Sequence, residues 1–252
     1  MKVILSPYAM KEVLAQLEEI LEPKGFEIAP FLVGWYNEAV VEDFLLPYHQ
    51  HTLAFCVISN ASMFKNTLQP FADNGLFSSL GSILDQAVHH TFMDCVKRLS
   101  HLNIQFIKDS DMDLVTKKPR ILTQTVGSVS GMAYYYQRRD IGAPDPWPNK
   151  KIYGVSIHPK YGGWFGFRGV FIINDFLEPS LQRMSPIDVI PDRNQRVKLL
   201  EDFNFHWRNN SFRDIIEVDS CFKYSSKQIE FFSGNRRKRL EILGIYKNEF
   251  CF

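Results

Sequence analysis

Residues 152–169 gather the side chains that suit a large, flat ligand. Glycine stands at four positions within eight residues, which lets the backbone turn sharply and lets another group approach it closely: Gly162, Gly163, Gly166 and Gly169. Aromatic rings and one cation stand around them, at Tyr161, Trp164, Phe165, Phe167 and Arg168. The same rings would also suit an ordinary packed core. The stretch therefore predicts either an aromatic-walled site with one anchoring charge or a tight, buried turn.

Two strands should position this stretch. Residues 152–157 alternate as a β-strand does, His158-Pro159 stops the pattern, and residues 164–173 continue as a second strand. The pattern predicts a β-hairpin with an aromatic tip.

Elsewhere the chain mixes strand and helix patterns, which indicates an α/β or α+β fold. A first helix should begin at Ser6-Pro7 and end before Pro23, with Gly25 beyond it. Further helices are predicted at about 61–73, 80–100, 121–139, 193–208 (capped by Asp192) and 225–243, and strands at 26–36, 52–59 and 103–108. Residues 109–120, 141–151 and 174–191 are predicted as connections.

Small residues mark the predicted helix 121–139, since Gly127 and Gly131 would each cost a helix about 1 kcal/mol relative to alanine. Something must therefore lie close to its backbone, either another helix or a flat ligand. Tyr134, Tyr135, Tyr136 and Gln137 should stand at the end of this helix, where their polar groups could bond a ligand or simply be satisfied in a core.

Composition excludes several classes of function. The 29 Lys and Arg residues nearly balance the 28 Asp and Glu residues, so the net charge predicts neither nucleic acid nor an anionic membrane as a partner. Four cysteines stand far apart without a Cys-x-x-Cys pair, which favours a reduced, cytoplasmic protein without a transmembrane span. No linker composition divides residues 1–252, so one domain is expected.

Familiar catalytic motifs are missing from the sequence. It contains no Gly-x-Gly-x-x-Gly, no Gly-x4-Gly-Lys-Ser/Thr, no Gly-x-Ser-x-Gly and no His-Glu-x-x-His. His89 and His90 are adjacent, so on a helix their rings point about 100° apart and do not form a chelating pair. We expect no metal ion held by protein ligands.

Several strings in the sequence occur together in one known family. They are His158-Pro-Lys-Tyr161-Gly-Gly-Trp164-Phe followed by Arg168-Gly, and FLVGWYNE (31–38), YYYQR (134–138), DPW (145–147) and FNFHWR (203–208). In this order they resemble the CblC (MMACHC) family of cobalamin-processing proteins, over roughly residues 20–245. The resemblance implies an α+β fold of the flavin nitroreductase type, with an antiparallel-rich sheet flanked by helices.

The resemblance also implies a function. The expected activity is glutathione-dependent dealkylation of alkylcobalamins and reductive decyanation of cyanocobalamin, with the cofactor held base-off and with FAD or FMN as a possible electron source. A second hypothesis is a non-catalytic cobalamin chaperone that serves a CblD-type partner, methionine synthase and methylmalonyl-CoA mutase. A third is a flavin reductase on the same fold. Either a monomer or a ligand-dependent homodimer fits the family.

Site residues follow from the same resemblance. The glutathione-binding arginines of the family match Arg168, Arg213 and Arg239, each of which alone would suggest a surface ion pair. The cobalamin-binding positions match Ile121, Leu122, Thr123, Gln124, Ser128, Tyr135, Tyr136, Gln137, Gly154, Ser156, His158, Gly162, Gly163 and Phe167, with Asp109 as a looser match.

Three of these positions require comment. Ser128 and Ser156 stand where other family members have His and Cys, so thiol handling is expected to differ. His158 lacks the Asp-x-His-x-x-Gly context in which cobalamin enzymes use histidine as a cobalt ligand, because Ser156 and Tyr161 stand at the Asp and Gly positions. We therefore expect His158 to be a turn residue whose ring bonds to backbone or ligand.

Overall fold

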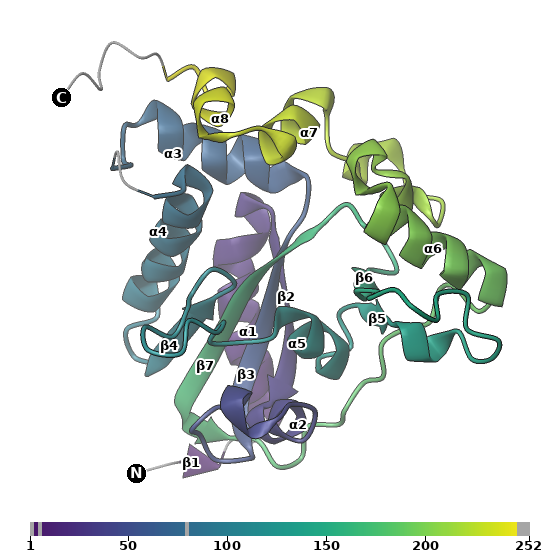
Figure 1. The fold of residues 1–252 in the computed structure, drawn as a ribbon. Helices are drawn as coiled ribbons and strands as arrows, with labels where there is room; N and C mark the ends of the chain where they lie inside the picture. The colour runs from purple at the N-terminus through teal and green to yellow at the C-terminus, as the bar shows by residue number, and fades with distance from the viewer. Residues whose placement is uncertain (1–2, 5–6, 79–80, 246–252) are drawn as a thin grey trace.

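A five-stranded sheet forms the centre of the molecule in the computed structural model, which describes residues 3–4, 7–78 and 81–245 (Figure 1). Its strands are β1 (Val3–Ile4), β2 (Phe26–Leu32), β3 (Thr52–Ser59), β4 (Ile104–Lys108) and β7 (Gly166–Leu177). Strand β7 pairs antiparallel with β3 along one edge and with β4 along the other, and β2 extends the sheet beyond β3. Among the described strands, the short β1 alone pairs in parallel, with the end of β7.

Alternating side chains of β3 separate two cores. Leu53, Phe55 and Val57 join the core beneath α1 (Pro7–Leu21) and α4 (Ile83–Arg98). The residues between them join the core on the opposite face, under α2 (Val33–Asn37) and α5 (Thr123–Val129): Ala54, Cys56 and Ile58. Because both faces are covered by helices, all eight residues of β3 are buried.

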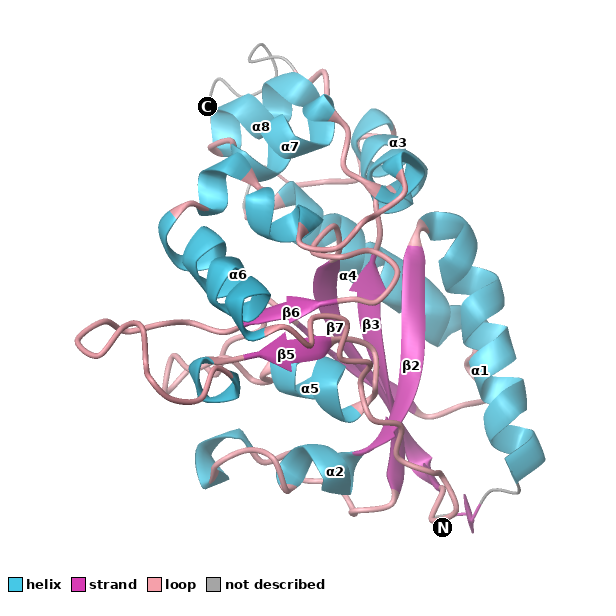
Figure 2. Ribbon diagram, turned by 90° about the vertical axis from the view of Figure 1, so that its right-hand side faces the viewer, coloured by secondary structure: helices cyan, strands magenta, loops and turns pink. Residues whose placement is uncertain are grey.

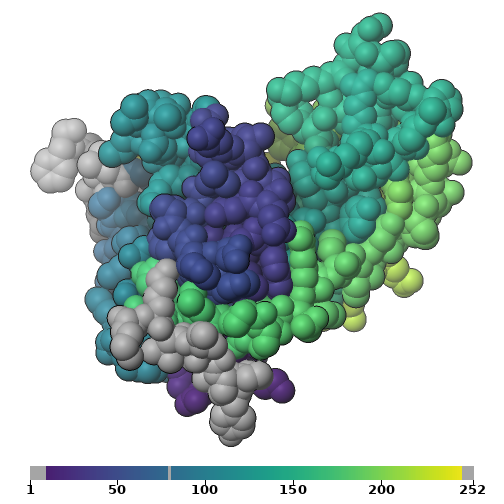
Figure 3. All heavy atoms as spheres, turned by 90° about the horizontal axis from the view of Figure 1, so that it is seen from below, coloured from purple at the N-terminus to yellow at the C-terminus, as the bar shows by residue number. Residues whose placement is uncertain are grey.

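A smaller sheet stands beside the large one. Strands β5 (Tyr134–Tyr136) and β6 (Val155–Ile157) pair antiparallel, and α6 (Arg193–Phe205) packs against them through a third core (Figure 2). Seen from below, the teal-green part of the chain at the upper right stands beside the blue part in the centre. An indentation separates the two (Figure 3). The small sheet and α6 therefore enclose a core of their own.

Shorter elements complete the fold. The top of the molecule in Figure 1 carries a π-helix (Phe64–Leu68) that continues into α3 (Gln69–Asp73), together with α7 (Ser226–Ser233) and α8 (Arg236–Ile242). The 3₁₀ segments are Glu22–Lys24, Glu42–Phe44, Arg138–Asp140, Trp207–Asn209, Ser211–Asp214 and Ser220–Phe222. Among the described residues, the structure contains no helix with the length and apolarity needed to span a membrane.

Several sequence predictions are confirmed. The fold is α+β with an antiparallel-rich sheet, and the strand predicted at 52–59 has those bounds. Gly25 adopts the left-handed conformation that ends the segment after α1, and the Asp192 carboxylate accepts a hydrogen bond from the backbone N–H of Gln195 at the start of α6. The predicted cap at Ser6 lies outside the described residues.

Other predictions are wrong. The hairpin of residues 152–173 does not form, since β6 pairs with β5 and β7 pairs with β3 and β4; a single backbone bridge joins His158 to Gly162. The helix at 121–139 ends at Val129, because Gly131 turns with φ of +75° and the tyrosine run continues as a strand.

The remaining differences concern element ends. The strand predicted at 26–36 gives way to α2 after Leu32, and the helix predicted at 193–208 ends at Phe205. The helix predicted at 225–243 is two helices, because the chain turns extended at Gly234 and Asn235 caps α8 anew.

Candidate functional site

A cavity of about 860 Å³ opens between the small sheet, the end of α6 and α7. Aromatic rings make up much of its wall, and amide, hydroxyl and guanidinium groups lie among them. The lining residues are Gln124, Tyr135, Tyr153, Gly154, Phe203, Asn204, Trp207, Arg208, Asn210, Phe212, Arg213, Tyr224, Ile229, Phe232 and Ser233. Such a mixture of ring faces and a few polar groups is typical of a site for a large organic ligand.

Four of the predicted site residues line this cavity. They are Gln124 from the first turn of α5, Tyr135 from β5, Gly154 just before β6, and Arg213. At Gly154 a Cβ atom would lie 2.6 Å from the Tyr135 ring, so glycine is what lets this ring lie along the wall. The structure thus brings the predicted corrin-binding residues of two elements to one surface.

Arg213 packs against the turn that contains Gly162 and Gly163, the glycine turn. Its backbone carbonyl accepts a hydrogen bond from the N–H of Gly163 at 3.0 Å, and its guanidinium donates to the Gly163 carbonyl and, at 3.1 Å, to Asn210. The guanidinium also lies 5.5 Å from the Trp164 ring centroid. Burial lowers the pKa of Arg213. The turn therefore fixes a cation at the cavity wall.

The glycines of the turn make room for protein atoms. A Cβ atom at Gly162 would lie 2.5 Å from the Arg213 carbonyl oxygen, and one at Gly163 would lie 2.8 Å from the Arg213 Cα atom. The absence of a side chain at these two positions is therefore explained by Arg213, and the contact of this turn with a flat ligand stays a prediction. Gly127 also makes room for a protein side chain, because the Phe167 ring lies 2.5 Å from its Cβ position. The sequence had predicted another helix or a ligand at this place.

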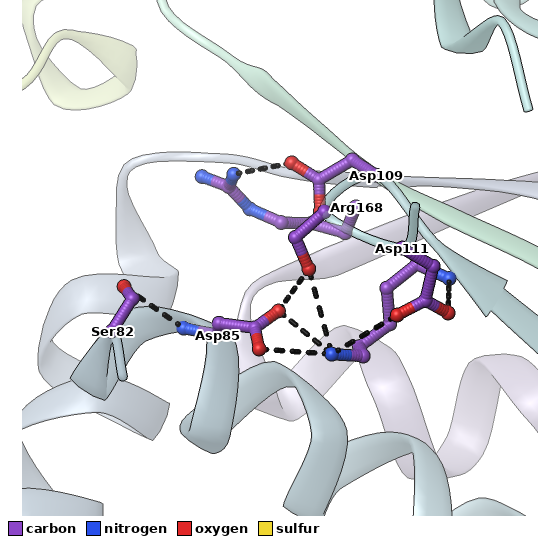
Figure 4. A network of polar contacts seen from close by, with 7 residues as sticks. Ser82, Asp85, Asp109, Asp111 and Arg168 are labelled. Carbon is purple, nitrogen blue, oxygen red and sulfur yellow. Dashed lines mark hydrogen bonds and ion pairs between the residues drawn. The ribbon is translucent and has the colours of Figure 1, made fainter. Parts of the chain in front are cut away.

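Arg168 lies deeper than Arg213. Its Nε donates a hydrogen bond of 2.8 Å to the Ser59 hydroxyl, and its Nη1 lies 3.8 Å from an Asp109 carboxylate oxygen (Figure 4). Asp109 therefore faces Arg168 and does not line the 860 Å³ cavity.

Tyr224 connects the two arginines. Burial raises the pKa of the Tyr224 hydroxyl, and the positive charges of Arg168 and Arg213 oppose that rise. The hydroxyl therefore lies within the field of both cations. Its ring packs on Trp164, and it lines both the 860 Å³ cavity and a second cavity of about 520 Å³.

Arg239 is apart from the other two arginines. It donates hydrogen bonds to the Phe231 and Phe232 carbonyl oxygens, at 3.1 and 3.2 Å, and lines a different cavity of about 300 Å³ with Arg236 and Leu240. The structure therefore gathers Arg168 and Arg213 but not Arg239.

Most other predicted cobalamin-binding residues do not line the 860 Å³ cavity. Ile121 and Tyr136 are core residues, and the Tyr136 hydroxyl donates to Asp188 at 2.7 Å, which together with burial raises its pKa. The Leu122 N–H donates to the Tyr36 hydroxyl, and Gln137 caps a 3₁₀ turn. Thr123 and Ser128 lie on α5, partly buried.

His158 is a turn residue, as expected. Its Nδ1 accepts hydrogen bonds from the backbone N–H groups of Lys160 at 3.0 Å and Tyr161 at 3.3 Å. Burial lowers the pKa of the ring to about 4, so the ring is neutral at pH 7 and carries its proton on Nε2.

Among the predicted site residues that the structure describes, Ser156 is the one with a buried side-chain atom that lacks a hydrogen-bond partner. Its side chain is buried, and its Oγ has no hydrogen-bond partner among the described residues. Ser156 pairs with Tyr135 across the small sheet, so the two side chains share one face, the face on which Tyr135 lines the cavity. Since a buried hydroxyl without a partner is costly, a ligand group at this wall would satisfy it.

The cavity wall opposite the small sheet was not predicted from the sequence. It is formed by the end of α6, the turns after it and α7, including Phe203, Trp207 and Tyr224. Residues 203–208 were part of the family resemblance, and this was the one feature of the sequence that could have indicated this wall. Trp207 is 49% exposed and Tyr153 is 59% exposed, which is unusual for rings that serve only a core.

Comparison with known proteins identifies the family. A model of the methylmalonic aciduria and homocystinuria type C family (MMACHC) matches residues 25–243. The chain belongs to this family. Two relatives named cyanocobalamin reductase / alkylcobalamin dealkylase, from Gallus gallus and Homo sapiens, are each 41% identical to it over 93% of this chain and over 97% and 82% of their own lengths.

A solved family structure agrees with the fold. The crystal structure of a C. elegans B12-trafficking protein CblC matches with a TM-score of 0.84 at 29% identity, covering 98% of this chain and 100% of that one. The resemblance found in the sequence strings is therefore confirmed for the family and for its fold.

Proposed function

We propose that this protein binds cobalamin in the 860 Å³ cavity and removes its upper axial ligand, acting in the cytoplasm as an alkylcobalamin dealkylase and cyanocobalamin reductase. One observation carries the proposal: an aromatic-walled cavity with a fixed cation, Arg213, in a chain of the MMACHC family. Five relatives from vertebrates bear the name of this activity.

The wall suits a corrin. Its rings offer flat apolar faces, and Gln124, Asn204 and Ser233 offer groups that can bond the amides at the corrin edge. The unpartnered hydroxyl of Ser156 fits the same role. Cobalamin would bind base-off, as the family resemblance implies. His158 offers cobalt no lone pair, because its Nδ1 accepts backbone hydrogen bonds and its Nε2 carries the proton.

Glutathione would be the second substrate for dealkylation. Its thiolate attacks the cobalt-bound carbon, the S–C bond forms, and the Co–C bond breaks with its electron pair left on cobalt. Arg213 and Arg168 would bind the glutathione carboxylates and favour the thiolate, since guanidinium groups pair with carboxylates and lower a thiol pKa. Aromatic rings packed around the bound substrate would limit the access of water to this step.

Decyanation needs an outside electron source. Electrons from a reduced flavin, FAD or FMN, or from a thiol would reduce cyanocobalamin so that cyanide leaves.

A visible-light titration tests the proposal. Adding the purified protein to methylcobalamin should shift its spectrum to the base-off form, and adding glutathione should then yield S-methylglutathione and reduced cobalamin. A protein that leaves both the spectrum and the methyl group unchanged would contradict it.

A chaperone without catalysis is the second candidate, favoured by the description of the C. elegans structure as a B12-trafficking protein. Such a protein would pass cobalamin to a CblD-type partner and onward to methionine synthase and methylmalonyl-CoA mutase. It would give the base-off shift but no S-methylglutathione, so the same titration separates the two candidates.

A further inference from the structure

Arg168 has an unusual environment for a buried cation. Its side chain is 9% exposed, yet the carboxylate paired with it among the described residues, that of Asp109, stays 3.8 Å away. The hydrogen bonds of the guanidinium to described residues leave from Nε and Nη1, to Ser59 and to the Phe167 carbonyl. A buried charge is normally paired closely, so this guanidinium retains capacity for another anion.

A rigid turn keeps Asp109 at that distance. On one side of it, Lys108 bonds both Asp85 carboxylate oxygens at 2.8 and 2.9 Å, and Ser110 contacts the same carboxylate (Figure 4). The backbone N–H of Asp109 donates to the Arg168 carbonyl at 3.1 Å. These bonds tie the turn to α4 and to β7, so the carboxylate of Asp109 is held near the guanidinium without reaching hydrogen-bond distance.

Ser59 acts on the same guanidinium from the opposite end. It is fully buried at the end of β3, and its hydroxyl oxygen accepts the hydrogen bond from Nε. This bond fixes the plane of the guanidinium. Because Nη1 donates one hydrogen to the Phe167 carbonyl, its second hydrogen and those of Nη2 are left for a carboxylate.

We infer that Asp109 is an internal counter-ion that competes with an incoming carboxylate for Arg168, and that Ser59 is the positioning residue that orients Arg168 to receive it. The inference rests on the proposed binding of glutathione by Arg168. It assigns opposite effects to two residues that contact one side chain: Asp109 weakens the binding of the tripeptide, and Ser59 strengthens it.

Steady-state dealkylation of methylcobalamin at varied glutathione concentration tests this inference in the full-length protein. Asp109→Asn should lower the KM for glutathione about threefold, the effect of removing one partly screened charge. Ser59→Ala should raise it about fivefold, as expected for loss of one hydrogen bond to a charged group, and Ser59→Thr should restore it. The affinity for cobalamin, read from the base-off shift, should stay unchanged in both Ser59 variants.

Controls separate this effect from others. Asp113→Asn removes the same charge from the same loop, but Asp113 bonds Thr116 and not Arg168, so the KM should stay at the wild-type value. Binding of unreactive S-methylglutathione, measured by calorimetry, repeats the comparison without turnover.

A KM that is unchanged or raised in Asp109→Asn would overturn the inference, because a residue with a merely structural role does not improve binding when it is changed. Failure of the wild-type protein to dealkylate methylcobalamin would instead contradict the proposed function.

Discussion

The large sheet and the cavity region are built in different ways. Every residue of β3 is buried, and its alternate side chains join two continuous cores. The cavity takes its wall from turns, helix ends and a three-residue strand, and two of its rings, Tyr153 and Trp207, are 59% and 49% exposed. The sheet therefore supplies stability, whereas the cavity region supplies polar and aromatic groups positioned to contact a ligand.

The largest expected effect concerns the sheet. Phe171 of β7 is fully buried, with its ring centroid 4.6 Å from that of Phe92. Phe171→Ala should therefore lower the free energy of unfolding by about 3–5 kcal/mol, measured by urea denaturation. Trp207→Ala in the cavity wall should cost under about 1 kcal/mol while weakening cobalamin binding. Equal losses of stability would remove the distinction between the two regions.

The glycine turn should show both kinds of effect. In Gly163→Ala the new methyl group would lie 2.8 Å from the Arg213 Cα atom, so Arg213 must move. We expect a stability loss of about 1–3 kcal/mol and a clearly raised KM for glutathione. Gly142→Ala is the control, since its φ of +70° costs stability but no atom lies within 4 Å of the added methyl. A normal KM in Gly163→Ala would show that the turn does not position Arg213.

His158 lies at the border of the two regions and predicts a pH effect. Its pKa is about 4 in the folded protein against 6.5 ordinarily, because of burial. Below pH 6.5 the unfolded chain gains a proton that the native ring does not, so this contribution to stability is present at pH 7 and is lost as pH falls toward 4. The loss should reach about 2 kcal/mol at pH 5.

Urea denaturation at pH 7 and pH 5 measures this effect. His158→Asn keeps a side-chain acceptor for the turn but cannot titrate, so its stability should fall less between the two pH values. The exposed His101→Asn serves as the control for loss of a histidine. Identical pH dependence of His158→Asn and the wild type would contradict the assignment.

The smallest effect should come from one hydroxyl group. Tyr224→Phe removes the hydroxyl that lies in the field of Arg168 and Arg213 and leaves the ring packing on Trp164 in place. The KM for glutathione should rise about threefold, with little change in melting temperature. Tyr48→Phe, which loses a hydroxyl bonded to Gln105 far from the arginines in sequence, is the matched control. If the KM for glutathione is the same in both variants, the Tyr224 hydroxyl has no role in binding and the residue contributes only its ring packing.

Sequence patterns predicted the features that depend on neighbouring residues, such as the buried strand, but not the pairing of distant segments. The run 52–59 is apolar throughout, so its burial as a central strand followed from composition. The hairpin prediction failed because alternation identifies a strand but not its partner, and β6 and β7 pair with segments distant in sequence. The tyrosines 134–136 followed a helical spacing that Gly131 interrupts.

The site was predictable only in part for a related reason. Gln124, Tyr135, Gly154 and Arg213 were found by family resemblance, which records positions that pack together in space. Tyr224 carries no motif of its own, and its importance arises from two arginines in other segments of the chain, Arg168 and Arg213. No spacing rule within one segment could have revealed that meeting.

The cavity wall is built from segments that lie far apart in the chain, so ligand affinity depends on the folding of the whole molecule. Segments from α5, the small sheet, α6 and α7 must all be assembled before the wall exists. Cobalamin that binds only this assembled form would therefore raise the melting temperature in proportion to the logarithm of its free concentration. Variants weakened anywhere in the large sheet should regain folded protein when grown or purified with excess cobalamin, so vitamin supply would act as a pharmacological chaperone for this chain.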